Sequence, residues 1–309
     1  MRGNSRAAVG RPRFVRARRR RLLKAALVLL TLVVLWMASG TVAAYVLTKR
    51  ARPPFPESGD GYAVPFRELR LRASDGVEIG AWSAEHNPAR AAVVLVHGNG
   101  ASRASLTDEA AFFYARGCTV LPISVRAHGD SGGDFNDIGL SARHDVIAAV
   151  EHLGRSNRPI VIYGSSLGAA AALFAGESLS DRVAGYVLSA PYADLREATR
   201  RRLERYLIWP FDEIAYGAMQ TGGRLVLPEI DRISPVAAAA RLPRGTKMVV
   251  FAGGEDDRAP ASDARRIAAP VGGRVVVIPG LDHEDMGALV GRPEWDEAVS
   301  ATLDDIAPR

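Results

Sequence analysis

The sequence predicts an α/β domain, with a mostly parallel sheet covered by helices on both faces, that follows one apolar N-terminal helix. Beyond about residue 63, short runs of β-branched residues alternate with helical segments. Several of these runs are apolar throughout, as expected of strands in a parallel sheet with both faces covered. A long uncharged stretch near the N-terminus supplies the separate helix. A chain of 309 residues suits one large domain with a terminal extension.

The basic residues are concentrated at the N-terminus. Residues 1–24 carry ten of the 40 Lys and Arg residues and no acid, which leaves 30 basic and 34 acidic residues in the rest of the chain. The body is therefore mildly acidic, and we expect no nucleic-acid partner. The single cysteine, Cys118, excludes an internal disulfide, and the six histidines show no metal-ligand spacing.

Residues 25–48 predict a membrane-spanning helix. Their 24 positions carry no charge, and at ~1.5 Å per residue such a helix reaches ~36 Å, enough to cross a hydrocarbon core of ~30 Å. The positive charges before this segment exceed those after it, so the positive-inside rule places residues 1–24 in the cytoplasm. We expect a single-pass membrane protein with an extracytoplasmic catalytic domain.

Two other interpretations of this segment are open at this point. Val42-Ala43-Ala44 resembles the cleavage site of a signal peptide, and Arg19-Arg20-Arg21 resembles part of a twin-arginine export signal. An uncleaved anchor is favoured, because the apolar run is longer than the usual ~7–15 residues of a signal peptide. Residues 49–62 are rich in Pro and Gly and predict a linker of restricted flexibility, so the domain is expected at 63–309.

The domain begins with a predicted hairpin. Phe66–Leu71 and Val77–Trp82 alternate apolar and polar residues around the turn signal Ser74-Asp75-Gly76. Further strands are expected at Ala92–His97, Cys118–Ser124, Pro159–Tyr163, Val183–Ser189, Met248–Ala252 and Val275–Ile278. Helices are expected at Leu106–Ala115, Leu140–Leu153, about Ser262–Ala268 and about Glu294–Ile306. This βαβ alternation predicts right-handed crossovers between parallel strands.

A candidate nucleophile follows the strand Pro159–Tyr163. Gly164-x-Ser166-x-Gly168 lies between that strand and an alanine-rich helical segment. Strand, sharp turn and helix are the context of a nucleophile elbow, which exposes the serine hydroxyl and frees the next backbone N–H to bind an oxyanion. The two glycines leave room for a strained serine and for close packing of the strand and the helix.

A nucleophilic serine needs a base and an acid that orients the base, here in the chain order Ser, acid, His. His283 is the only histidine after Ser166, and it follows the strand Val275–Ile278. We therefore expect His283 at the carboxyl edge of the sheet. Three acids that follow the strand Met248–Ala252 compete for the third role: Glu255, Asp256 and Asp257.

Four segments together resemble the α/β-hydrolase superfamily, particularly its serine-aminopeptidase and acylglycerol-lipase-like branch. They are Gly164-x-Ser166-x-Gly168, His97-Gly98-Asn99-Gly100, Asp256-x-x-x-Pro260 and Gly280 with His283. The resemblance runs from about residue 63 to the C-terminus and implies an α/β-hydrolase fold with a small helical cap. Since the acid loop of the family commonly reads Asp-x-x-x-Pro, it favours Asp256. It also implies that the N–H groups of Asn99 and Leu167 form an oxyanion hole.

The segment Val125–Gly132 resembles the Arg-Gly-x-Gly-x-Ser loop of the family with two departures. Ala127 stands in place of the usual glycine, and His128 in place of a common aromatic residue. The departures concern substrate contacts near the site rather than the chemistry, and His128 is a candidate lining residue of the pocket.

These residues predict a serine hydrolase that cleaves carboxylic esters, of lipids or of small acyl compounds, through an acyl-enzyme on Ser166. This chemistry needs no metal or organic cofactor. A serine peptidase and an acyltransferase would use the same residues and remain alternatives. A non-catalytic binding scaffold is a further alternative, against which the intact set of Ser, Asp and His argues.

The segment at about 191–243 is longer than one crossover helix needs and predicts a cap over the site. Within it, Leu195–Leu207 predicts an amphipathic helix with an arginine-rich face. This helix either packs on the body with its basic face in solvent, or lies on an anionic membrane surface through Arg200, Arg201 and Arg202.

Overall fold

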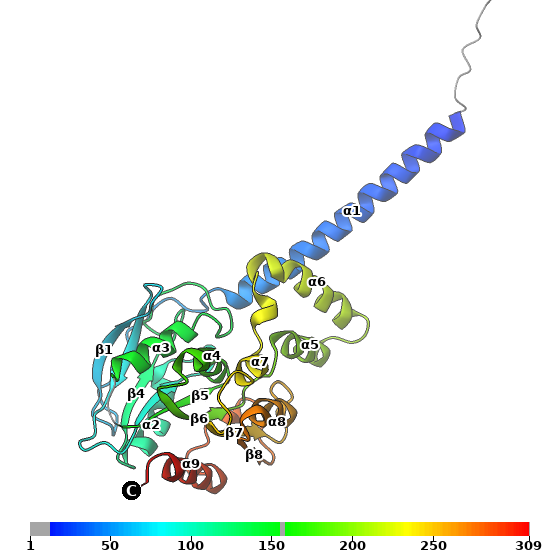
Figure 1. Cartoon of the computed structure of the whole chain (residues 1–309). Helices are drawn as coiled ribbons and strands as arrows, with labels where there is room; N and C mark the ends of the chain where they lie inside the picture. The colour runs from blue at the N-terminus through cyan, green and yellow to red at the C-terminus, as the bar shows by residue number, and fades with distance from the viewer. Residues whose placement is uncertain (1–12, 155–157, 309) are drawn as a thin grey trace, which may run out of the picture.

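In the computed structural model, which describes residues 13–154 and 158–308, one long helix projects from an α/β body (Figure 1). This helix, α1 (Arg13–Thr48), begins inside the basic N-terminal segment, because arginine is a good helix former. Residues 1–12, with Arg2, Arg6 and Arg11 of the predicted tail, lie outside the described residues.

An eight-stranded sheet forms the centre of the body. Its order is β1-β2-β4-β3-β5-β6-β7-β8, and among these strands β2 alone runs antiparallel to its neighbours. The strands are β1 (Arg67–Arg72), β2 (Glu78–Ser83), β3 (Ala92–Val96), β4 (Thr119–Ile123), β5 (Ile160–Ser165), β6 (Val183–Ser189), β7 (Lys247–Gly253) and β8 (Arg274–Ile278). The predicted hairpin is the β1–β2 pair, and the predicted α/β-hydrolase fold with a mostly parallel sheet is confirmed.

Helices cover both faces of this sheet. The long ones of the body are α2 (Thr107–Tyr114), α3 (Arg143–His152), α4 (Leu167–Gly176), α8 (Ala261–Ala268) and α9 (Pro293–Ile306), with the short α7 (Pro235–Ala239). Single 3-10 turns lie at Arg103–Leu106, Glu177–Leu179, Ile230–Arg232, Ala269–Val271 and Asp285–Gly287. The bounds of α2, α3, α8 and α9 agree with the expected helices to within three residues at each end.

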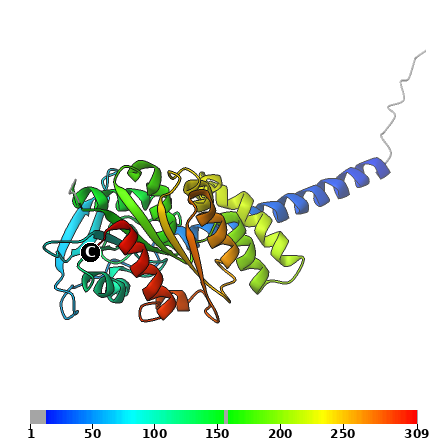
Figure 2. The same ribbon diagram turned by 60° about the horizontal axis from the view of Figure 1, so that its bottom comes forward.

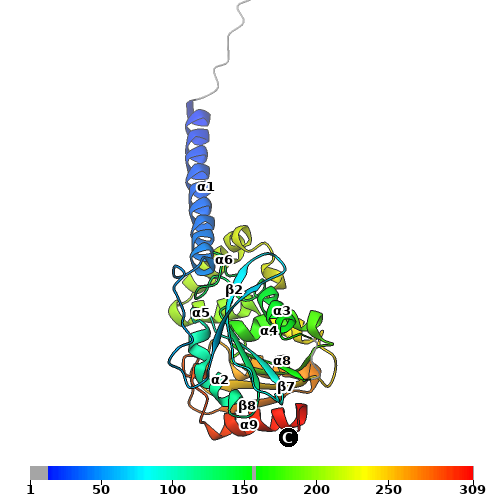
Figure 3. The same cartoon turned by 90° about the vertical axis from the view of Figure 1, so that its left-hand side faces the viewer.

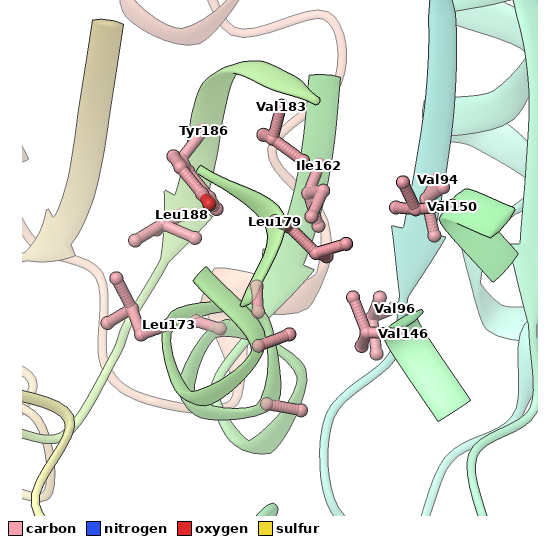
Figure 4. Close-up of a cluster of buried hydrophobic side chains, with 14 of the residues drawn as sticks. Val94, Val96, Val146, Val150, Ile162, Leu173, Leu179, Val183, Tyr186 and Leu188 are labelled. Carbon is pink, nitrogen blue, oxygen red and sulfur yellow. The ribbon is translucent and has the colours of Figure 1, made fainter. Parts of the chain in front are cut away.

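The larger part of the core lies between the sheet and the helices α3, α4, α7 and α8. Figure 4 shows Val94 and Val96 of β3 directed toward Val146 and Val150 of α3. The alanine-rich sequence of α4 suits this position, because small side chains let the helix lie close to β5.

The other face of the sheet is covered by α2 and α9 (Figure 2). Trp295 of α9 is fully buried there and packs its ring against Phe112 of α2, 4.6 Å between centroids, and against Phe251 of β7. This aromatic group joins the C-terminal helix to the centre of the sheet.

The segment after α1 is attached to the body. The Arg50 guanidinium donates to the carbonyl oxygens of Gly129, Ser131 and Gly133 at 2.6, 2.7 and 3.0 Å. Glu57 is buried and accepts from Arg103 at 2.9 Å. The Pro-rich residues that follow the helix therefore fix the direction in which α1 leaves the domain.

Two helices between β6 and β7 lie outside the core. They are α5 (Leu195–Tyr206) and α6 (Phe211–Val226), and α6 lies against the C-terminal half of α1 (Figures 1 and 3). In contrast α7, which falls inside the segment predicted as a cap, places Ala238 and Ala239 in the main core.

The arginines of α5 bind carboxylates of the protein itself. Arg201 donates to the buried Asp263 at 2.6 Å, and Arg200 binds Glu213 of α6 at 2.8 Å. This arrangement favours packing of α5 on the body over contact of its arginine-rich face with a membrane surface.

We expect Trp295→Ala to lower the free energy of unfolding by about 3–5 kcal/mol, because the cavity left by a buried tryptophan is only partly refilled. Thermal unfolding of the full chain in detergent micelles would measure the loss. Glu297→Ala, an exposed position on the same helix, should change stability by less than about 0.5 kcal/mol. An equal effect of the two changes would show that α9 is not anchored through Trp295.

Candidate active site

The predicted site residues meet at the carboxyl edge of the sheet. Asn99 follows β3, Ser166 follows β5, Asp256 follows β7 and His283 follows β8. Since all four strands are parallel, their carboxyl ends lie at one edge, where open α/β sheets bind ligands. One cavity at this edge is lined by Asn99, Ser166 and His283.

Ser166 occupies a strained turn between β5 and α4. Its φ of 48° and ψ of −107° lie outside the common regions for residues with side chains. A Cβ at Gly168 would lie 2.2 Å from the carbonyl oxygen of Val96, and one at Gly164 would lie 2.7 Å from the backbone of Gly168. Positions 164 and 168, two residues before and after Ser166, therefore accept only glycine, as a nucleophile elbow requires.

A chain of hydrogen bonds starts at Ser166. Its Oγ lies 3.3 Å from Nε2 of His283, and Nδ1 of His283 lies 2.8 Å from Oδ2 of Asp256. With Nδ1–H donating to the carboxylate, Nε2 is free to accept the hydroxyl proton of the serine. The structure thus brings together the three side chains that the sequence assigned to nucleophile, base and acid.

The carboxylate of Asp256 is buried but well satisfied. Its Oδ1 accepts from the N–H groups of Arg258 and Ala259 at 2.9 and 2.8 Å. Burial alone would raise the pKa of Asp256, but the hydrogen bonds from His283 and from these N–H groups outweigh it and hold the pKa below its usual value. Asp256 is therefore charged at neutral pH.

The two competing acids do not reach His283. Asp257 is exposed and forms an ion pair with Arg205 of α5. Glu255 is exposed, and its backbone N–H donates to the carbonyl oxygen of Leu281. Of the three acids after β7, the geometry selects Asp256.

Two histidines hold the loop that contains Asn99. His97 is fully buried; its Nδ1–H donates to the carbonyl of Gly98 at 2.7 Å and its Nε2 accepts from Val125 N–H at 3.1 Å. Burial lowers the pKa of His97 to about 3, so this ring stays neutral. His128 accepts from Gly100 N–H at 3.1 Å. The sequence suggested His128 as a lining residue of the pocket, but it is not among the residues that line the cavity.

The side chain of Asn99 is fixed by a residue that sequence reasoning missed. Nδ2 of Asn136 donates to Oδ1 of Asn99 at 2.8 Å. Asn136 lies in an irregular loop without a motif, so no sequence signal marks it. The φ of 60° at Ala127 is a conformation that favours glycine, so it accounts for the usual glycine of the resembling loop and leaves the alanine found here without a structural explanation.

The cavity beside Ser166 has a volume of about 600 Å³. Its wall includes Leu47 of α1, Leu195 and Ala198 of α5, and Glu109 of α2. Leu47 was expected to belong to the membrane span alone, and no pattern in the sequence links it to the site. The N-terminal helix thus contributes to the wall of the candidate active site.

Glu109 is a buried carboxyl group in this wall. It is 3% exposed, and Oε1 accepts from the hydroxyl of Tyr163 at 3.0 Å. Burial raises the pKa of Glu109 to about 7, and the hydrogen bonds to its carboxylate only partly oppose this effect. One sequence signal could have marked Glu109: it is an acid on the face of the predicted helix Leu106–Ala115 that packs against the body.

The fold and the serine turn define a protein of the α/β-hydrolase class. Residues 93–295 match the alpha/beta hydrolase family, and the chain belongs to this family. The uncharacterized protein Rv2307c of Mycobacterium tuberculosis is 30% identical over 280 residues, which cover 85% of this chain and 90% of that protein.

Two further similarities are more distant. The esterase Pf2001 of Pyrococcus furiosus superposes with a TM-score of 0.66 at 20% identity, over 82% of this chain and 97% of that one, and shows the same fold. The uncharacterized membrane protein YNL320W of Saccharomyces cerevisiae is 26% identical over 146 residues, 46% of this chain and 51% of that protein.

No group of three or more His, Cys, Asp or Glu side chains that could hold a metal ion occurs among residues 13–154 and 158–308.

We expect Glu109→Gln to change how stability depends on pH. The folded-state pKa of about 7 lies above the ordinary value of a glutamate carboxyl group, so the parent loses stability as pH rises through about 7, by up to about 3 kcal/mol. The uncharged glutamine cannot show this loss. Between pH 5 and pH 8, the free energy of unfolding should therefore fall more in the parent than in the variant. An equal fall in the two proteins would contradict the raised pKa.

Proposed function

We propose that this protein is a membrane-anchored serine hydrolase that cleaves carboxylic esters. The observation that carries the proposal is the hydrogen-bonded series from Ser166 through His283 to Asp256, on a strained turn at the carboxyl edge of the sheet. The esterase activity named for Pf2001 agrees with this proposal.

In the proposed reaction, Nε2 of His283 takes the proton of the Ser166 hydroxyl as Oγ attacks the ester carbonyl carbon. The charged Asp256 holds the imidazole in the required tautomer and stabilises its protonated form. His283 then gives the proton to the leaving alcohol, and an acyl-enzyme remains on Ser166. Attack by water, with the same histidine as base, releases the acid and restores the serine.

Two backbone groups are assigned to the oxyanion. Leu167 is the first residue of α4, so its N–H has no acceptor within the helix and lies at the positive end of the helix dipole. Asn99 faces the same cavity from the loop after β3. The N–H groups of these two residues would stabilise the negative oxygen of the transition state, each by ~2.7–4 kcal/mol.

The proposal includes α1 as a retained membrane anchor with the catalytic domain outside the cytoplasm. Residues Ala17–Thr48 form one helix whose length and composition suit a membrane span. The possible cleavage site at Val42-Ala43-Ala44 lies in the part of α1 that contacts α6, with Ala44 buried. Contact with the folded domain favours retention of this segment over its removal.

We expect Ser166→Ala and His283→Ala each to reduce ester hydrolysis on the order of 10⁶-fold, and the double variant to add little, because these residues act as one unit. Asp256→Asn should be less severe, on the order of 10⁴-fold. Asp257→Asn, the matched control on the same loop, should retain activity. Esterase activity or labelling by a fluorophosphonate in Ser166→Ala would overturn the assignment.

The topology is tested by a reporter that is active only outside the cytoplasm. Fused after Arg309, it should be active, because the five positive charges at Arg18–Arg21 and Lys24 keep the N-terminal end of α1 inside. The protein should also remain in the membrane fraction after an alkaline carbonate wash. A soluble product beginning near Tyr45 would instead demonstrate a cleaved signal.

A further inference from the structure

The cap helix α6 and the anchor α1 touch at backbone distance. A Cβ at Gly40 would lie 1.9 Å from the carbonyl oxygen of Ala218, and one at Gly222 would lie 2.5 Å from the backbone of Met37 and Thr41. Gly40 and Ala44 on α1, and Ala218 and Gly222 on α6, repeat small residues at intervals of four. This close approach through small residues is typical of helices that associate within membranes.

Two hydrogen bonds fix the alignment of these helices. Nε1 of Trp36 donates to the carbonyl of Ile214 at 2.8 Å, and Oγ1 of Thr41 donates to the carbonyl of Gly222 at 3.3 Å. The N-terminal end of α6 therefore lies beside Trp36, and its C-terminal end lies nearer the body. Figures 1 and 3 show α6 beside the lower part of α1.

The charge pattern of α1 sets the depth of these contacts in a membrane. The uncharged run begins at Ala25, and about 20 residues are needed to cross the hydrocarbon core, which reaches Ala44. Trp36 then lies about 17 Å from the inner boundary. Moving the span toward the N-terminus would bury Arg21 and Lys24 at a cost of about 2.5–3.5 kcal/mol each near the centre. With the hydrocarbon core beginning at Ala25, the part of α1 that contacts α6, Trp36 to Ala44, lies in the outer half of the bilayer.

The side chains around the N-terminal end of α6 suit this environment. Ile208 and Trp209 are 78% and 79% exposed, the highest values among the large apolar side chains of the described residues. Phe211, Ile214 and Tyr206 nearby are each at least half exposed. Such a concentration of exposed apolar side chains marks an interaction surface.

Two of the three charged groups of α6 are paired within the protein. Glu213 is bound by Arg200 of α5, and Arg224 is bound by Asp231, in both cases within the protein. Asp212 lies in the first turn of α6, where the helix dipole favours an acid. It shares a small pocket with Arg200, Glu204, Glu213 and Tyr216. The remaining exposed surface of the turn 206–211 is apolar.

We propose that the turn 206–211 and the N-terminal half of α6 are inserted into the hydrocarbon core of the lipid bilayer beside α1, and that the substrate is an acyl ester of a membrane lipid. The substrate class rests on the proposed hydrolase function. The same anchor that contacts α6 contributes Leu47 to the cavity of Ser166, and α5 contributes Leu195 and Ala198. An acyl chain leaving the bilayer between α1 and α5 thus meets Leu47, Leu195 and Ala198 on its way to the nucleophile, while Thr199 and Arg202 of α5 line the same cavity and can face the polar ester group.

The insertion is tested by single labels on the full chain in phosphatidylcholine vesicles. A thiol-reactive, environment-sensitive fluorophore is attached to Trp209→Cys, to Leu30→Cys in the middle of α1, and to Arg244→Cys at the amino end of β7. The native Cys118 is buried, and burial raises the pKa of its thiol to about 11, so it should not react. Lipids with a nitroxide on the acyl chain should quench the labels at 209 and 30 but not the label at 244.

The outcomes separate the anchor from the inserted cap. Quenching at 30 without quenching at 209 would overturn the insertion while leaving the anchor in place. Loss of quenching at 30 as well would overturn both. The labels report on position alone, so the same result is expected on a Ser166→Ala background, whether or not the protein is a hydrolase.

The substrate class is tested by the double change Ile208→Asp and Trp209→Asp. Hydrolysis of a long-chain acyl ester embedded in the vesicles should fall by about tenfold or more, because acidic side chains oppose insertion of the turn. Hydrolysis of a short soluble ester should stay unchanged, which also shows that the variant is folded. Arg244→Asp makes the same change of two charge units far from the cap and should leave both activities intact.

Equal loss of activity on the two esters, or no loss on the embedded ester, would overturn the lipid-substrate proposal. Absence of activity on either ester in the unaltered protein would instead overturn the hydrolase function, and the label positions would still decide whether the turn is inserted.

Discussion

The close contact between Gly168 and Val96 is the constraint on which the site depends. A helix can begin directly after Ser166 only if its first turn packs against the backbone at the end of β3, where a side chain at Gly168 would lie 2.2 Å from a carbonyl oxygen. This contact places the free N–H of Leu167 beside the loop that contains Asn99. The strain at Ser166 is maintained by the surrounding core, since α4 is buried along almost its whole length.

The polar groups behind the cavity are held in defined protonation states by burial and hydrogen bonding. His97 is neutral because a charged imidazole cannot be solvated beneath the sheet edge, and it can therefore accept the N–H of Val125. Asp256 is charged for the opposite reason, because three donors surround its two oxygens. These contrasting environments leave one ionised acid beside His283 and keep the loop around Asn99 rigid.

The local part of this arrangement could be predicted from the sequence, because it depends on short segments. The strand before Ser166 and the two glycines around it lie within a few residues of the serine. His283 follows from chain order, because it is the only histidine after Ser166. The choice of Asp256 needed the resemblance to the family, since Asp257 and Glu255 share the same loop. Asn136, Glu109 and Leu47 could not be found in this way, because their proximity to the site results from packing of segments far apart in the chain.

The contact between α1 and α6 is the clearest example of such a non-local feature. The hydrophobicity of residues 25–48 predicts a span, but it does not distinguish a span surrounded by lipid from one that binds another helix. The small residues Gly40 and Ala44 carry that information only once Ala218 and Gly222 are known to face them. Because α1 also supplies Leu47 to the cavity, removing this helix would open a wall of the site as well as delete the proposed membrane anchor. The helix proposed as the anchor is therefore also part of the domain's candidate binding surface.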